Sequence, residues 1–308
     1  MRVQFVDAVA RELSNDARSV FLTGDLGFNA LEGLQNQLGP RFLNVGVAEQ
    51  NMMGVAAGMA LTGLRPWAYS IAPFATYRCL EQIRNDICLH QLPVRVVGNG
   101  GGYTYGIMGS THHALEDLGA LKPLPNMHLY FPCSNNHVAA AVRQMADLAD
   151  PAYLRLAISG FADDRPALSE HPTTLTRRYA ERPGARSRGL TIVAAGHAAQ
   201  IVNRMSKPTE DAEIDIFGIA RFPLDLGLDR DLRESVRATR RVLFVEEHYA
   251  SGGIGESFAA AVAADVDAFS VMSAEYRKGQ RYGSAAFHLN QSGLTPETVT
   301  NAARAMLG

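Results

Sequence analysis

The chain has 308 residues, of which 47% are hydrophobic and 19% are charged. This balance is typical of a globular protein with enough apolar material for about two domains of roughly 100–200 residues each. The formal net charge is −2, and acidic and basic residues are scattered along the chain. A surface field of one sign is therefore absent, and we expect neither nucleic acid nor an anionic membrane as a partner.

The cysteines and the first residues indicate the compartment. Cys79, Cys88 and Cys133 form no CxxC pair and are odd in number, so we expect reduced thiols. The opening residues lack a secretory signal, and no apolar run reaches the ~18 residues that cross a bilayer. The sequence thus predicts a soluble cytoplasmic protein.

Short apolar strands alternate with helix-length segments over the first half of the chain. The first helix is predicted at 4–17, where Phe5, Val9 and Leu13 recur on one face. The next predicted strands are 19–23, 42–47, 65–71, 93–98, 128–131 and 152–157, and the next helices are 49–62, 74–89, 112–120 and 135–148. Strands separated by helices are typical of parallel βαβ units, so we predict an α/β sheet covered on both faces.

The composition changes over residues 161–188, which carry three prolines and six arginines. We interpret this segment as an exposed linker between a domain at 1–160 and a domain at 189–308. The second domain has predicted strands at 190–195, 213–217 and 241–246 and predicted helices at 197–206, 229–239 and 253–265. The predicted fold is therefore α/β, with two doubly wound sheets.

Glu49 is the principal candidate for chemistry. It begins a predicted helix directly after an apolar strand, and residues 45–48 would provide apolar walls around it. A carboxyl group in such surroundings can exchange a proton near neutral pH with a heteroaromatic ring. The alternative is a first-turn glutamate that only benefits from the helix dipole. The residues that follow favour the proton-exchange role.

Gly54 and Gly58 lie inside the helix that this acid begins, where each glycine costs ~1 kcal/mol relative to alanine. They indicate close approach of another backbone, either at a symmetric subunit interface or on the chain's own sheet. Farther along, Phe74 and Tyr77 lie one helical turn apart, with Ile71 before them. Such a pair can hold a flat ring by stacking and edge contacts, although aromatic pairs also occur in ordinary cores.

Residues 98–106 are rich in glycine but lack both the GxGxxG spacing and the P-loop lysine, so we predict an active-site loop. The loop leads to His112 and His113, and either could act as a polar contact or proton carrier, or simply lie at the surface. Residues 23–27 do not complete a diphosphate–magnesium motif, because Leu26 takes the third position and no Asn-Asn pair follows. We therefore predict no metal ligands in this chain.

Together these segments resemble the C-terminal half of transketolase and of 1-deoxyxylulose-5-phosphate synthase, over nearly all 308 residues. The matching segments are 41–52, 74–77, 111–117, 125–127, 245–248 and 252–255. The resemblance implies a thiamine diphosphate pyrimidine-binding domain at 1–160 and a transketolase C-terminal-like domain at 189–308.

By this resemblance Glu49 is the acid that activates thiamine diphosphate, and His112 is a catalytic residue that contacts substrate. The positions implied at the cofactor are Asp25, Ile71, Phe74 and Tyr77. His113 and Arg155 are further substrate candidates. The diphosphate-binding half is missing, so the resemblance implies a separate N-terminal-half transketolase subunit that holds the cofactor's Mg²⁺, in an α₂β₂ heterotetramer.

The implied reaction transfers a two-carbon ketol unit from a ketose-like donor to an acceptor. Two alternatives remain open: the β subunit of a 2-oxoacid dehydrogenase E1 component, and a scaffold subunit without chemistry. The family pattern has a histidine and an aspartate where this chain has Gly100 and Met108, and a phosphate-binding arginine where it has Ile158. Arg155 is the nearest substitute. We therefore expect at least one substrate to be unphosphorylated or carrier-bound.

Overall fold

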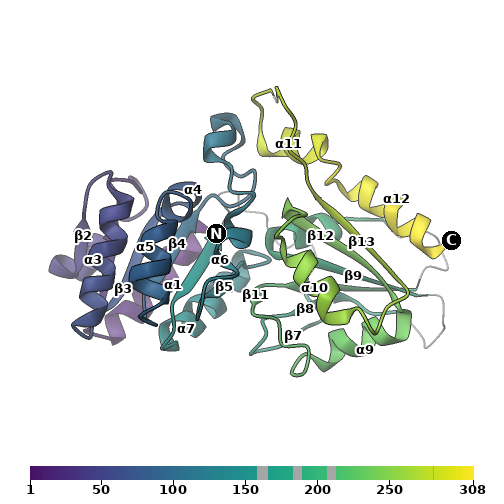
Figure 1. Ribbon diagram of the computed structural model, residues 1–308, viewed down its shortest axis with the longest axis horizontal. Helices are drawn as coiled ribbons and strands as arrows, with labels where there is room; N and C mark the ends of the chain where they lie inside the picture. Colours follow the sequence, from purple (N-terminus) through teal and green to yellow (C-terminus); the bar gives the residue numbers. More distant parts are fainter. Residues whose placement is uncertain (158–165, 183–188, 207–212, 280) are drawn as a thin grey trace. The chain divides into compact units, whose positions relative to one another are not determined.

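The computed structural model describes residues 1–157, 166–182, 189–206, 213–279 and 281–308 (Figure 1). The chain divides into two compact units. The first comprises Met1–Tyr130 with Asn135–Gly160, and the second comprises Phe131–Ser134 with Phe161–Gly308. None of the helices within the described ranges is both long and apolar enough to span a bilayer.

Six strands of the first unit form a parallel sheet in the order β5-β6-β4-β3-β1-β2. The strands are β1 (Ser19–Thr23), β2 (Phe42–Asn44), β3 (Arg65–Ile71), β4 (Arg95–Asn99), β5 (His128–Tyr130) and β6 (Ala152–Leu156). All residues of β1, β4 and β6 are buried, as expected for a parallel sheet with helices on both faces.

The helices of this unit are α1 (Arg2–Asn15), α2 (Glu32–Leu38), α3 (Glu49–Leu61), α4 (Ala72–Thr76), α5 (Leu80–Gln82), α6 (Asp117–Leu121) and α7 (Val138–Asp147). The predicted helix at 74–89 is divided, because a break after α4 is followed by α5 and a π-helix at Ile83–Cys88. The chain runs from β1 outward to β2 and then returns past β1 to β3, so the right-handed connections through α2 and α3 lie on opposite faces. The carboxyl ends of β1 and β3 therefore form the topological switch point of this sheet.

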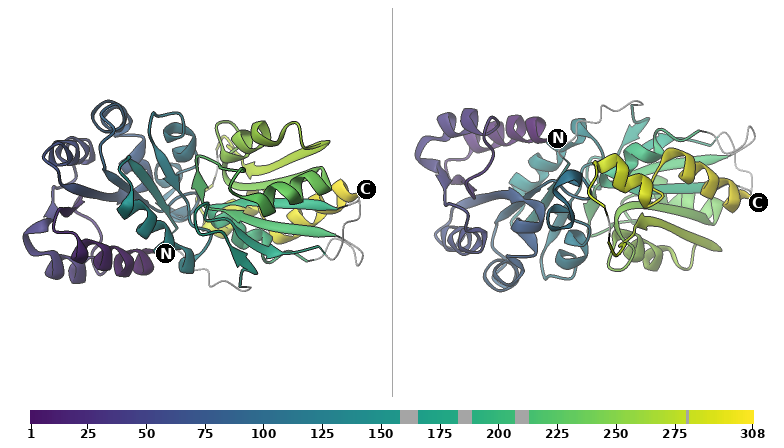
Figure 2. Two further views of the ribbon diagram at one scale, coloured as in Figure 1. Left: turned by 90° about the horizontal axis from the view of Figure 1, so that it is seen from below. Right: turned by 90° about the horizontal axis from the view of Figure 1, so that it is seen from above.

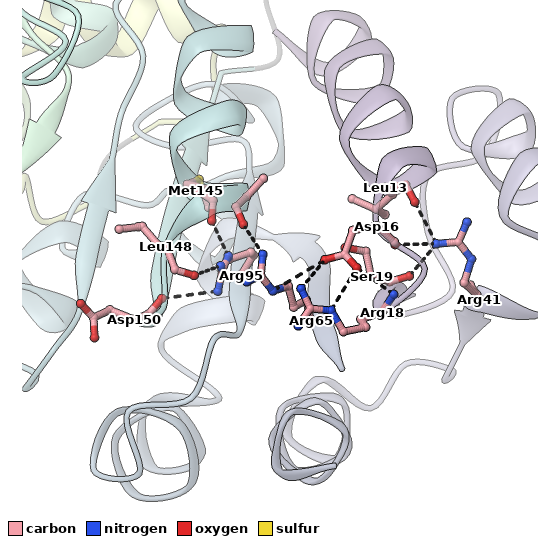
Figure 3. Close-up of polar contacts among 11 residues, drawn as sticks. Leu13, Asp16, Arg18, Ser19, Arg41, Arg65, Arg95, Met145, Leu148 and Asp150 are labelled. Carbon is pink, nitrogen blue, oxygen red and sulfur yellow. Dashed lines mark hydrogen bonds and ion pairs between the residues drawn. The ribbon is translucent and has the colours of Figure 1, made fainter. Parts of the chain in front are cut away.

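Three arginines lie at the amino-terminal ends of the strands, at the end of the sheet opposite the switch point (Figure 3). Arg41 donates to the Leu13, Asp16 and Ser19 carbonyls at distances of 2.8, 3.1 and 3.0 Å, and Arg65 donates to the Ala146 carbonyl at 3.0 Å. Arg95 is fully buried and donates to the carbonyls of Met145, Leu148 and Asp150. Burial lowers the pKa of Arg95 to about 10, with a smaller contribution from Arg65. These cations satisfy carbonyls at and beyond the ends of α1 and α7.

The second unit contains a sheet in the order β13-β12-β9-β10-β8-β7. Its strands are β7 (Ser169–Glu170), β8 (Arg177–Ala180), β9 (Leu190–Ala195), β10 (Ile214–Ile219), β12 (Arg241–Tyr249) and β13 (Ala268–Ala274). The linker interpretation of 161–188 is corrected for residues 166–182, because β8 pairs antiparallel with β10 and with β7. The sequence did not reveal β8 because arginines in and beside it indicated an exposed segment. In the structure Arg178 and Arg182 form ion pairs with the buried Asp215, at 2.9 and 3.1 Å.

The helices of the second unit are α8 (Ala199–Val202), α9 (Arg230–Thr239), α10 (Ile254–Val262), α11 (Ala285–Gln291) and α12 (Pro296–Leu307). The connection from β9 through α8 reaches β10 on one side, whereas α9 and α10 lead back across the sheet to β12 and β13. Right-handed connections therefore place α8 on one face and α9 and α10 on the other. α12 packs against α8, and Figure 2 shows it across the sheet from α10. The carboxyl ends of β9 and β12 are the switch point of this second sheet.

The matched segments at 245–248 and 252–255 meet in the structure. Glu246 is buried in the second half of β12, and its carboxylate accepts the backbone N–H groups of Ile254 (2.8 Å) and Gly255 (3.3 Å). An acid at this position caps the positive end of α10. A Cβ at Gly253 would overlap the Glu246 carboxylate, so the glycine is required by the cap.

Candidate active site

Glu49 lies at the switch point of the first sheet. It is the first residue of α3, and only 1% of it is exposed. The hydroxyl of Ser70, near the end of β3, donates to Glu49 Oε1 at 3.0 Å. A Cβ placed on Gly24, directly after β1, would lie 3.5 Å from the same oxygen. The ends of two strands thus enclose the acid.

The apolar walls differ from those that the sequence predicted. Val47 is 74% exposed, so its side chain does not enclose the acid, and Val45, Gly46 and Ala48 are only half-buried. The buried Cys79 is a better indicator of the surroundings of Glu49. Burial raises the pKa of the Cys79 thiol to about 12, and the Glu49 carboxylate contributes to this rise. Sequence reasoning missed Gly24, Ser70 and Cys79 because they are contributed by three separate elements.

Arg78 is the nearest cation to the acid. Its Nη1 atom lies 2.7 Å from Glu49 Oε2, and its guanidinium lies 4.6 Å from the centre of the Phe74 ring. The Arg78 side chain is 42% exposed, so it can leave the carboxylate without breaking a packed core. The four-residue spacing between Phe74 and Arg78 could have revealed the contact between these two side chains from the sequence.

Phe74 and His112 come together beside this ion pair. Their ring centres are 5.1 Å apart in an edge-on arrangement, and the Tyr105 ring lies 6.0 Å from His112 on another side. Thr111 Oγ1 lies 3.0 Å from His112 Nδ1. The structure therefore gathers Glu49, Phe74 and His112 within one region of the first unit.

Tyr77 lies at the end of α4 and holds the segment before α6. Its hydroxyl donates to Glu116 Oε2 at 2.8 Å and accepts the Glu116 backbone N–H at 3.0 Å. Burial raises the pKa of Tyr77, with Asp117 and Glu116 adding to the rise, so the phenol stays protonated. Ile71 is half-buried at the start of α4. Contacts of Tyr77 and Ile71 with a cofactor remain predictions.

His113 and Arg155 occupy interior positions. His113 is buried, lies edge-on to Tyr103 at 5.2 Å, and has its Nε2 atom 3.3 Å from the Gly106 carbonyl. Arg155 Nε lies 3.1 Å from Asp117 Oδ2, and its Nη2 donates to the Ala114 carbonyl at 2.6 Å. Both residues thus contact the segment 101–116, and their contact with a substrate remains a prediction.

This segment is anchored rather than loose. The backbone N–H groups of Gly100 and Gly101 donate to the Leu156 carbonyl at 2.8 and 2.9 Å, and Gly102 pairs with Ala114. Gly100 has φ +86°, and a Cβ there would overlap the ring of Tyr105. Position 100 therefore cannot carry a side chain in this conformation.

Asp25 lies in the turn after β1 and is hydrogen-bonded to Asn44 at the end of β2. Asn44 Nδ2 donates to its carboxylate at 2.9 Å, and Asn44 Oδ1 accepts the backbone N–H groups of Asp25 and Gly46, each at 3.0 Å. This exchange ties the end of β2 to the turn after β1, directly before Glu49. Asp25 is exposed, with φ +56°.

Comparison with known proteins identifies the family. The transketolase pyrimidine-binding domain model matches residues 1–159, and the transketolase C-terminal domain model matches residues 180–299. The chain belongs to the transketolase family. The predicted family and fold class are thereby confirmed.

Several transketolase relatives are similar over most of the chain. It is 30% identical to a subunit of the apulose-4-phosphate transketolase of Phocaeicola vulgatus, over 82% of this chain and 80% of that protein. It is 31% identical to 1-deoxy-D-xylulose-5-phosphate synthase of Pelotomaculum thermopropionicum over 96% of this chain and 45% of that protein. A solved split gene transketolase, described as an inactive β4 tetramer, superimposes with a TM-score of 0.80 at 28% identity, covering 99% of this chain and 96% of that chain.

The residues present fit the aminopyrimidine end of the cofactor that the transketolase family implies. The buried carboxylate lies beside an aromatic ring, and Asn99, at the end of β4, presents a buried Oδ1 atom for which the described part of the chain provides no hydrogen-bond partner. This acceptor could receive an amino group. Around it, the described residues contain no group of three His, Cys, Asp or Glu side chains able to hold a metal ion. Ile158, where the resemblance implies a phosphate-binding position, lies outside the described residues.

Proposed function

We propose that this chain is one subunit of a thiamine diphosphate-dependent transketolase that transfers a two-carbon ketol unit. The observation that carries the proposal is the buried Glu49 at the switch point, bonded to Ser70 and flanked by Phe74 and His112. Thiamine diphosphate supplies the nucleophilic carbon of this chemistry. Glu49 would hold a proton at the aminopyrimidine ring, and Phe74 would contact the face of that ring.

Arg78 sets a condition for this arrangement. Because it forms an ion pair with Glu49 Oε2, the guanidinium has to withdraw before a ring can take that oxygen. Arg78 is exposed enough to turn into solvent, but Glu49 is only 1% exposed, so breaking the pair leaves a buried carboxylate without its cation. This costs about 3–5 kcal/mol, which the incoming ring has to offset. His112 is the candidate for contact with the substrate, and Arg155 is retained in the proposal only as a support for the loop.

A partner subunit would supply the diphosphate and Mg²⁺ sites. Exposed apolar side chains support this proposal, because Phe28, Val47, Ile107 and Met108 are 72, 74, 72 and 50% exposed. These residues lie in the segments that follow the carboxyl ends of β1, β2 and β4. Because the strands are parallel, these ends lie at the same end of the sheet. Apolar side chains gathered at one edge are typical of a protein interface.

A second contact would join two copies of this chain in the proposed α₂β₂ assembly. Gly54 and Gly58 are exposed on α3, and a Cβ at either position would meet no atom within 4 Å. Packing on the chain's own sheet therefore does not explain these glycines. Close approach of a second α3 remains the interpretation that we favour.

We further propose that one substrate is unphosphorylated or carrier-bound. Tyr105 fills the space at Gly100, and Arg155 is engaged by Asp117, so neither position offers a cation to a phosphate. Comparing kcat/KM for a phosphorylated sugar with that for the free sugar tests this point. A hundredfold preference for phosphorylated donor and acceptor alike, about 2.7 kcal/mol, would contradict it.

Reconstitution tests the subunit assignment. The purified chain should bind no Mg²⁺–thiamine diphosphate alone, and ketol transfer should appear when an N-terminal-half transketolase subunit is added. Assay with a ketose and, separately, with a 2-oxoacid distinguishes transketolase chemistry from that of an E1 component. Full activity from this chain alone would refute the division into subunits.

A further inference from the structure

The second unit has a cavity at its own switch point. The cavity measures about 220 Å³ and is lined by residues that follow or end β9 and β12, together with parts of α11 and α12. One water molecule needs roughly 10–15 Å³, so this space accommodates a small organic molecule. Ligands of open α/β sheets bind outside the carboxyl ends of the strands at such a point, and the first unit places Glu49 at the corresponding position.

One end of the cavity carries a buried acid. Glu247, on β12, is 5% exposed, and its Oε2 atom lies 3.5 Å from Nδ1 of His197, which follows β9. The amide of Gln200 also lines the cavity and is 2% exposed. A carboxylate accepts hydrogen bonds, so this end suits a donor such as an ammonium or hydroxyl group.

The lining also includes a cation. Arg204 is exposed and lines the cavity, seven residues beyond His197. Thr295 and Pro296, the N-cap and first residue of α12, border the cavity as well, so the positive end of that helix dipole adds to the charge of Arg204.

Most of the remaining lining is apolar, with Asn290 as a polar exception. Ile201 comes from one wall, and Ala286, Leu289 and Leu294 come from the α11 side. We propose that this cavity binds a small organic anion with a hydrogen-bond donor at the end opposite its charge, joined by an aliphatic or flat spacer. The donor would contact Glu247, the anion would contact Arg204, and the spacer would pack on the apolar side chains.

Methyl NMR of the full chain, labelled at Ile and Leu, tests the proposal with 6-aminohexanoate as the probe. The methyl signals of Ile201, Leu289 and Leu294 should shift saturably, with a Kd of about 1 mM or tighter. Hexanoate lacks the donor and hexylamine lacks the anion, so each should bind at least tenfold more weakly.

Two substitutions assign the ends. Arg204→Met should weaken 6-aminohexanoate and hexanoate about tenfold while leaving hexylamine unchanged. Glu247→Gln should weaken 6-aminohexanoate and hexylamine while leaving hexanoate unchanged. Arg230→Met on α9, on the opposite face, is the matched control and should change nothing. Because Arg204 and Arg230 are exposed, both variants should fold. Absence of saturable shifts at these methyls, or equal binding by wild type and Arg204→Met, would overturn the proposal.

Discussion

Arg155→Met should destabilise the first unit by removing the cation that balances a buried carboxylate. Asp117 is fully buried, Arg155 is 9% exposed, and their closest atoms are 3.1 Å apart. The Tyr153 hydroxyl also donates to Asp117 Oδ2 at 2.7 Å but cannot neutralise its charge. Removing one partner of a buried pair costs about 3–5 kcal/mol. The Ala114 carbonyl loses a donor as well, so the segment before α6 should loosen.

Trp67 makes this measurement specific to one unit. It is the single tryptophan of the sequence, it lies on β3, and it is buried. Its fluorescence during urea or thermal unfolding therefore reports on the first unit. At roughly 2–4 °C per kcal/mol, the expected loss lowers the midpoint temperature by about 6–20 °C.

Two further variants complete the test. Arg143→Met removes an exposed arginine from α7 in the same unit and should stay within about 0.5 kcal/mol of wild type. Asp117→Asn in the Arg155→Met background removes the unbalanced charge and keeps an acceptor for Tyr153, so it should restore about 2 kcal/mol or more. An Arg155→Met variant as stable as wild type, with altered substrate KM alone, would show that Arg155 serves the substrate instead.

Gly54→Ala together with Gly58→Ala should stabilise the isolated chain by up to about 2 kcal/mol, because both positions are open and each glycine costs ~1 kcal/mol in a helix. Sedimentation of this double variant should show weaker self-association than that of the wild type. Unchanged self-association would count against an interface formed by α3. Stability of the first unit should fall as the pH rises from about 9 to about 12, because burial raises the pKa of the Cys79 and Cys88 thiols from near 9 to about 12, and the unfolded chain loses those protons first. Trp67 fluorescence in urea at several pH values measures this, and Cys88→Ala should flatten the slope; a rise in stability over that interval would refute it.

The sequence predicted most strands of the first unit because apolar strands alternate with turn residues there. It missed α2 (Glu32–Leu38), and of the helix expected at 112–120 only α6 (Asp117–Leu121) forms. It missed β8 in the second unit because the strand carries two arginines, which pair with Glu170 and Asp215 in the fold. It also missed β13, in which Ala268 and Ser270 are exposed. The two C-terminal helices were missed as well.

The candidate site was only partly predictable. Glu49, Phe74 and His112 stood out through their local patterns, and the structure places them together. Arg78 and Ser70 could not be assigned to the acid without knowing that β1 and β3 are adjacent. His113 and Arg155 were expected to contact a substrate, which stays a prediction; their contacts with Gly106, Ala114 and Asp117 could not be read from the sequence.

The most direct test of the central claim is deuterium exchange at the reactive carbon of thiamine diphosphate in the reconstituted assembly. Glu49→Gln keeps the size of the side chain but removes its titratable proton, so the exchange rate should fall by about 10²–10⁴-fold while assembly is retained. Glu81→Gln, at an exposed position in α5, should leave the rate unchanged. A Glu49→Gln assembly that exchanges at the wild-type rate would contradict the role of Glu49 as the activating acid.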